Sequence, residues 1–191
     1  MDWPSVLTII LGSSFLGALL INLSSWIISS RQRKRHNQFL ALTLAHTLEK
    51  YSYDCMNAVV EHDLHQQSGG NAGKALGYPP DAMKIPDEPF KDFDLALLDA
   101  VLDFPQRVAF ATEEVKFLVN VVDDDVASAT SCQNTIKLAS EAVTLATRLR
   151  THYELARRDL NFGEYDLRQF IDQKVASQTP RVAAGGAGST A

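Results

Sequence analysis

The stretch of this sequence most capable of chemistry is Glu61-His62-Asp63-Leu64-His65. His62 and His65 stand three residues apart, which places both imidazoles on one face of a helix. Imidazole is a common ligand of zinc and iron. Cys55 lies on the same face two turns earlier. His62, His65 and Cys55 are therefore the candidate metal ligands of the chain.

A metal centre needs three or four converging ligands, and the spacing argues against such convergence. In an up-down-up bundle the first and third long helices run parallel, which separates Cys55 from Cys132 by roughly 15 to 20 Å along the axis. Glu61 and His65 are four residues apart, whereas a di-iron site uses Glu-x-x-His. The alternative interpretation is the polar end of a helix, so we expect no cofactor.

Other catalytic motifs are absent from the sequence. The glycines of 69–74 follow no strand and precede no Lys-Ser/Thr pair, so they do not form a phosphate loop. The three aspartates at 123–125 lack the alternation and the glycine of a calcium loop. Two cysteines exclude a disulfide-dense scaffold. A non-enzymatic role is favoured, and a membrane-tethered metal-binding protein or enzyme using His62 and His65 is the alternative.

An uncharged apolar stretch covers residues 6–28, long enough for a transmembrane helix, with Trp3 and Trp26 at its two ends. We assign residues 1–30 to a single membrane anchor and residues 31–36 to a basic juxtamembrane segment. Positive charge follows the stretch and none precedes it, which predicts an outside N-terminus and a cytoplasmic domain at the inner (plasma) membrane. The cations that set this topology and could contact lipid headgroups are Arg31, Arg33, Lys34 and Arg35.

Small residues recur at four-residue spacing within the apolar stretch, as Ser13 with Gly17 and Ser14 with Ala18. This spacing lets two membrane helices approach closely and predicts self-association through the span. The alternative is coincidence, because Gly and Ser are common in membrane helices.

Beyond the basic segment, residues 37–175 show helical periodicity and predict an all-α fold, an up-down-up bundle of three long helices with a short fourth. The first helix has about 30 residues and could be continuous with the span. One apolar stripe on it holds Ala41, Leu44, Leu48, Tyr51, Cys55, Ala58, His62 and His65. The last long helix is rich in alanine, which indicates close helix packing.

The breaks between these helices follow from glycine and proline. Their density over 67–92 predicts a long, mobile loop. Pro105 predicts a break in the middle region, with one short helix ending near Asp103 and a longer one starting after it. The last long helix should run from the 123–125 turn to 161–163. A short amphipathic segment, 164–175, and a disordered tail, 176–191, complete the chain.

Charge is unevenly distributed along the chain. The net charge of −5 argues against nucleic-acid binding. Residues 81–125 hold twelve Asp or Glu against four Lys or Arg, which suggests either a docking face for a basic partner or a solvated surface. Arg148, Arg150, Arg157 and Arg158 read as a solvated basic face of the last long helix. We therefore expect a single-pass membrane-anchored bundle that acts by protein–protein interaction, with another protein or with itself.

Overall fold

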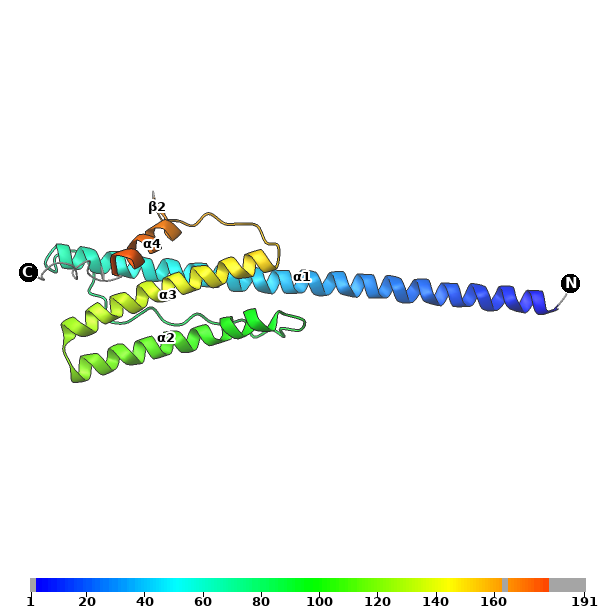
Figure 1. Cartoon of the computed structure of the whole chain (residues 1–191), viewed down its shortest axis with the longest axis horizontal. Coiled ribbons are helices and arrows are strands. Elements are labelled where there is room, and N and C mark those ends of the chain that lie inside the picture. The colour runs from blue at the N-terminus through cyan, green and yellow to red at the C-terminus, as the bar shows by residue number, and fades with distance from the viewer. Residues whose placement is uncertain (1–2, 163–164, 179–191) are drawn as a thin grey trace, which may run out of the picture.

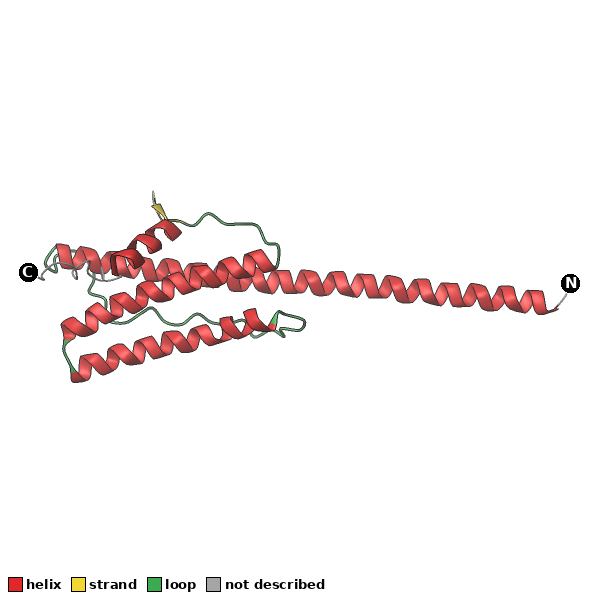
Figure 2. Ribbon diagram, in the orientation of Figure 1, coloured by secondary structure: helices red, strands yellow, loops and turns green. Residues whose placement is uncertain are grey.

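The protein is a helical bundle. The computed structural model describes the backbone of residues 3–162 and 165–178, and the side chains of residues 26, 28–161 and 166–177. The helices are α1 (Trp3–Gln67), α2 (Leu95–Val121), α3 (Asp124–His152) and α4 (Leu167–Gln178). Two short strands, β1 (Asn161–Phe162) and β2 (Tyr165–Asp166), pair antiparallel before α4. The predicted helical bundle is confirmed, and this hairpin is the strand structure in the described part (Figure 2).

Helix α1 is a single rod whose N-terminal part extends well beyond the other helices (Figure 1). It passes through the basic segment 31–36 without a break, so the helical backbone of 37–67 is continuous with that of the apolar stretch. Among the residues whose side chains are described, no helix is both long enough and apolar enough to cross a bilayer.

Two predictions on the N-terminal part fall outside the described side chains. The anchor over 1–30 rests on an apolar stretch of which only Trp26 and Ile28 have described side chains. The small-residue pairs Ser13 with Gly17 and Ser14 with Ala18 lie wholly outside them. Both remain predictions.

The order of helix directions differs from the predicted up-down-up. Ser52 Oγ donates to the Ala139 carbonyl at 3.0 Å, and Arg150 pairs with Glu49, so residue numbers rise along α1 as they fall along α3. Contacts of α2 with α3 show the same relation, since Arg107 faces Glu141 and Asn134 faces Glu114. Helices α1 and α2 are therefore parallel to each other, and α3 is antiparallel to both.

The loop over residues 68–94 explains this difference. It runs back along the whole bundle between α1 and α2 (Figure 1), a distance that an extended chain of this length covers easily. It is also held to α1, although we expected it to be mobile. The Leu76 N–H donates to His62 Nδ1 at 3.2 Å, and the Tyr51 hydroxyl donates to the Pro80 carbonyl at 3.3 Å.

Helix α2 is unbroken, with Pro105 inside it, so the predicted break is wrong. Proline removes one backbone donor and disturbs one turn. The buried side chains of Phe104 and Val108, on either side of it, hold both halves of the helix in the core. Asp103 caps nothing here, because its carboxylate pairs with Arg107 one turn later at 2.6 Å.

Helix α3 stops well before the predicted end at 161–163. The Leu155 N–H donates to the Arg150 carbonyl at 2.8 Å and the Glu154 N–H donates to the Thr151 carbonyl at 3.4 Å. This pair of bonds closes a helix end with its C′ residue in the left-handed region, and Glu154 has φ of 54°. A glycine usually occupies that position, so a glutamate there does not signal a helix end.

The core lies where α3 meets α1. Small side chains on both helices are fully or almost fully buried there, so the backbones can approach closely. The predicted alanine-rich contact is confirmed by Ala41, Ala45, Ala139, Ala142 and Ala146. Larger buried side chains fill the remaining space on either side, among them Leu40, Leu44, Leu48, Ile136 and Leu149.

Helix α4 closes one side of this core. It starts at Leu167 and ends at Gln178, slightly later than the predicted segment 164–175, because the hairpin precedes it. Leu167 and Ile171 are buried against the bundle. The predicted disordered tail begins at 176, inside α4, and residues 179–191 lie outside the described part of the chain.

The loop provides a first test of the fold. Gly73 has φ of 73°, and a Cβ there would lie 2.2 Å from the Glu61 carbonyl oxygen. We expect Gly73→Ala to lower the free energy of unfolding by at least about 1–3 kcal/mol in urea denaturation. Gly77→Ala is the matched control, because a Cβ at Gly77 meets no atom within 4 Å. Equal stability of the two variants would contradict the packed loop.

Candidate functional site

The candidate metal ligands are near one another on α1 but differ in burial and in hydrogen bonding. His62 is buried, and its Nδ1 accepts a hydrogen bond from the Leu76 N–H, so its remaining proton is on Nε2. His65 is half-buried, and its Nδ1 has no hydrogen-bond partner. Cys55 is fully buried about two turns before His62 on α1. Within the described residues, no three His, Cys, Asp or Glu side chains come close enough to hold a metal ion.

The two cysteines remain apart even though α1 and α3 are antiparallel. Cys132 is half-buried near Asp63 and Lys174, whose side chains form an ion pair. Asp63 is eight residues from Cys55, about 12 Å along α1. The prediction that Cys55 and Cys132 do not converge therefore agrees with the structure, although it assumed parallel helices.

Two of the four cations of the basic segment 31–36 have partners within the protein. Arg33 lies 3.7 Å from Asp92, and Lys34 lies 2.9 Å from Glu154. The bond and charge of Lys34 hold the pKa of the Glu154 carboxyl below its ordinary value. Asp92 and Glu154 are also the two non-glycine residues with positive φ among those described. The side chains of Arg31 and Arg35 are exposed, so their charges face the surroundings of the protein.

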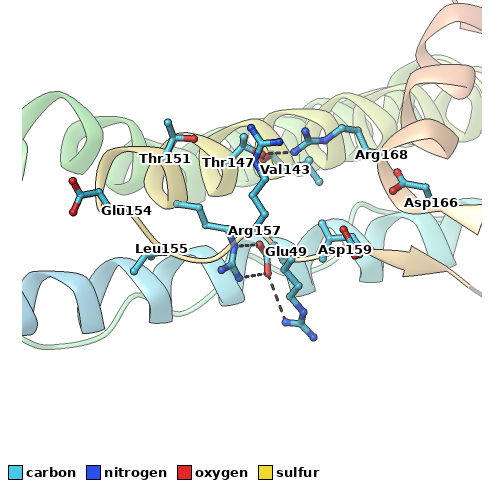
Figure 3. A pocket seen from close by; sticks show the side chains of 13 residues that line it. Glu49, Val143, Thr147, Thr151, Glu154, Leu155, Arg157, Asp159, Asp166 and Arg168 are labelled. Carbon is cyan, nitrogen blue, oxygen red and sulfur yellow. Dashed lines mark hydrogen bonds and ion pairs between the residues drawn. The ribbon is translucent and has the colours of Figure 1, made fainter.

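A concave site lies where α3 ends and α4 begins (Figure 3). We call it the arginine cleft. Its volume is about 510 Å³. It is lined by α1, the last turns of α3, the connecting segment 153–160 and the start of α4. Its polar and charged lining residues are Glu49, Thr147, Arg150, Thr151, Glu154, Arg157, Arg158, Asp159, Asp166 and Arg168.

Glu49 stands at the centre of the arginine cleft, with its side chain only 5% exposed. Arg150 donates to both carboxylate oxygens, from Nε at 2.5 Å and from Nη2 at 2.9 Å. This hydrogen bonding raises the pKa of Arg150 above its already high ordinary value. Arg158 adds a contact of 3.6 Å to Glu49 and a bond of 2.6 Å to His46 Nδ1. The buried Glu49 carboxylate is thus held by a two-bonded arginine pair, the geometry that offsets the cost of removing its charge from water.

The other charged side chains of the cleft are less fully paired. Arg168 donates to the Thr147 hydroxyl. Asp166 accepts from the Gln169 N–H at 3.0 Å and so caps α4. In Figure 3, Arg157 extends from the connecting segment toward Thr147, and Arg168 extends toward it from α4.

Sequence reasoning missed this cleft for a specific reason. It placed Arg150, Arg157 and Arg158 on one long helix and treated them as solvated. Because α3 ends early, Arg157 and Arg158 belong to the connecting segment and face Glu49 and α4 instead. The available signal was Glu49 itself, a carboxylate directly after Leu48 in the buried stripe of α1. A charge at such a position requires a partner.

A second surface feature lies on α2. Its buried side chains face α3, yet an exposed apolar row follows the opposite side of the helix. We call this row the outer face of α2; it consists of Leu95, Leu102, Phe110, Phe117 and Val121. Phe110 is 73% exposed and Phe117 61%. The spacing of seven, eight, seven and four residues keeps the row on one side of a helix.

No protein-family model, curated protein or solved structure matches this chain. Its function is therefore argued from its own surfaces.

The Glu49–Arg150 pair should be the most costly ion pair to break. Arg150→Met leaves a buried carboxylate without its main partner, and we expect a loss of about 3–5 kcal/mol in the free energy of unfolding. Arg107→Met, which removes two ion pairs that are more exposed, one with Asp103 and one with Glu141, should cost about 1 kcal/mol or less. Adding Glu49→Met to Arg150→Met should recover much of the loss. Similar costs for the two single variants, measured by urea denaturation, would refute this assignment.

The buried thiol of Cys55 should make the folded protein less stable at alkaline pH. Burial raises the pKa of its thiol to about 12, and the hydrogen bond with Tyr51 only partly offsets this. An unfolded cysteine ionises near pH 8.5, so above that pH the unfolded state loses a proton that the folded state keeps. The stability present below about pH 8.5 should therefore decline by about 1.4 kcal/mol per pH unit.

Cys55→Ala should remove this part of the decline between pH 9 and pH 10, whatever its stability at pH 7. Urea denaturation at pH 7, 9 and 10 measures the difference, and Cys132→Ala provides the comparison for a half-buried thiol. Parallel stability profiles for wild type and Cys55→Ala would show that Cys55 ionises normally in the folded protein.

Proposed function

We propose that this protein is a membrane-anchored adaptor whose helical bundle binds another protein through the outer face of α2. The observation that carries the proposal is the exposed apolar row on a helix that is already fully packed on its other side. A contiguous row of large apolar side chains with this exposure is typical of a protein interface. An amphipathic helix of the partner would lay its apolar side along this row.

The charge around the row selects the partner. Residues 94–125 hold eight carboxylates against two cations. Asp99 and Glu113 are exposed and lie between the apolar residues of the row. In a two-fold dimer the same face would meet itself, so these carboxylates would oppose one another. We therefore assign the face to a basic amphipathic helix of a different protein, rather than to a second copy of this chain.

The membrane part of the proposal rests on the sequence. The uncharged stretch 6–28 would span the inner membrane, and Arg31 and Arg35 would face headgroups on the cytoplasmic side. Because the helical backbone of α1 is continuous from Trp3 to Gln67, the bundle would project directly from the span. The outer face of α2 would then be presented in the cytoplasm, parallel to the axis of the anchor.

Site-specific crosslinking in the native cell tests this function. A photo-crosslinking amino acid is placed at Phe110 or Phe117 of the full-length chain, and at Phe39 as the matched control. Phe39 is 59% exposed but lies on α1, away from the row. We expect one defined crosslinked protein from positions 110 and 117, which position 39 does not give. Its crosslinked peptide should be a basic amphipathic helix.

The charge of the face is tested separately. Asp99→Lys combined with Glu113→Lys should abolish the crosslink at position 110 while leaving the thermal unfolding of the protein unchanged. Equal products from positions 39 and 110 would refute the docking face. If the only crosslinks were between copies of this chain, the outer face of α2 would be a homo-oligomer interface and not the docking site of a basic partner.

A further inference from the structure

The arginine cleft contains two guanidinium groups that form no ion pair with a carboxylate of the described residues. Arg157 makes no hydrogen bond or ion pair with another described residue, and Arg168 bonds only the neutral hydroxyl of Thr147. The two side chains come from different elements and line the same cleft (Figure 3). Like charges gathered in a concave site repel each other unless an anion lies between them.

The carboxylates of the cleft are largely committed elsewhere. Glu49 is saturated by Arg150 and Arg158. Glu154 is paired with Lys34 at 2.9 Å, and in Figure 3 it lies at the far end of the cleft from Arg168. Asp166 caps α4. Asp159 alone among the lining carboxylates has no such partner in the described structure, so the unpaired charges of the cleft are the guanidinium groups of Arg157 and Arg168 and the one carboxylate of Asp159.

We propose that the arginine cleft binds a phosphomonoester, with the phosphate between Arg157 and Arg168. A guanidinium group presents a planar fork of donors that matches phosphate oxygens, and two such forks can bind one tetrahedral dianion. The Thr147 hydroxyl already donates to the Val143 carbonyl, but the hydroxyl of Thr151 lines the same cleft and can donate to a remaining phosphate oxygen. The volume of about 510 Å³ leaves room for an organic group attached to the phosphate.

A soluble phosphomonoester fits the position of the cleft better than a lipid headgroup. Glu49, at the centre of the cleft, is 21 residues beyond Ile28, which ends the proposed span. This separation corresponds to about 30 Å along a straight helix. A headgroup of the membrane that anchors the chain would lie too far away. The ligand class is therefore a small phosphorylated metabolite.

Titration calorimetry with the full-length chain in a phosphate-free maltoside detergent tests the site, with glycerol 3-phosphate as the probe. We expect saturable binding at one site per chain. Arg157→Gln and Arg168→Gln should each weaken binding about tenfold or more, because each removes a charge-assisted contact. Asp159→Asn should strengthen binding severalfold, since it removes an opposing charge. Arg157 is exposed, so its variant should fold even if Arg168→Gln does not.

Arg35→Gln is the matched control, because it removes an exposed arginine that does not line the cleft. Its affinity should equal that of the wild type. Absence of saturable binding, or an equal loss in Arg35→Gln, would overturn the site. In a second arm, the chain is mixed with phosphatidylcholine vesicles that contain phosphatidic acid. Arg157-dependent binding to these vesicles without binding of glycerol 3-phosphate would overturn the soluble ligand and assign the cleft to a headgroup.

Discussion

The close contact between α1 and α3 is the constraint on which the rest of this structure depends. Alanines on both helices bring the backbones together, and Ser52 spans the contact to the Ala139 carbonyl. Helix α2 packs on α3 from one side and α4 packs on it from another. Each further element is therefore positioned by α3, and α3 is positioned by α1. The Glu49–Arg150 pair fixes the register of the two helices at one end of this contact.

Much of the local structure could be predicted from the sequence, because it follows from periodicity. The buried stripe of α1 contains Leu44, Leu48, Tyr51 and Cys55 as expected, and the alanines of α3 lie at the predicted contact. The direction of α2 could not be predicted, because the loop over 68–94 is long enough to join either end of the bundle. The break predicted at Pro105 does not occur, because core packing on both sides compensates for one lost hydrogen bond.

The arginine cleft was the part least accessible to sequence reasoning. It exists because α3 ends with Glu154 in a left-handed conformation, which residues other than glycine adopt uncommonly. With a longer α3, Arg157 and Arg158 would lie along the helix and Glu49 would lose its second arginine. One backbone angle thus decides whether these arginines form a solvated helix face or a cleft. For α2, the acidic residues of 81–125 suggested either a docking face or a solvated surface, and the exposed apolar row beside them was not predicted.

The unbroken backbone of α1 has a mechanical consequence. A helix resists twisting and axial compression far more than a flexible linker does, so the segment before residue 37 and the bundle after it move as one rigid body. The ion pairs of Arg33 with Asp92 and of Lys34 with Glu154 hold α1 to the rest of the bundle where it enters the bundle. Any rotation of the N-terminal segment about its axis is therefore transmitted directly to α3. The outer face of α2 and the arginine cleft turn with it, and the orientation of both is set by the angle at which the N-terminal segment is held.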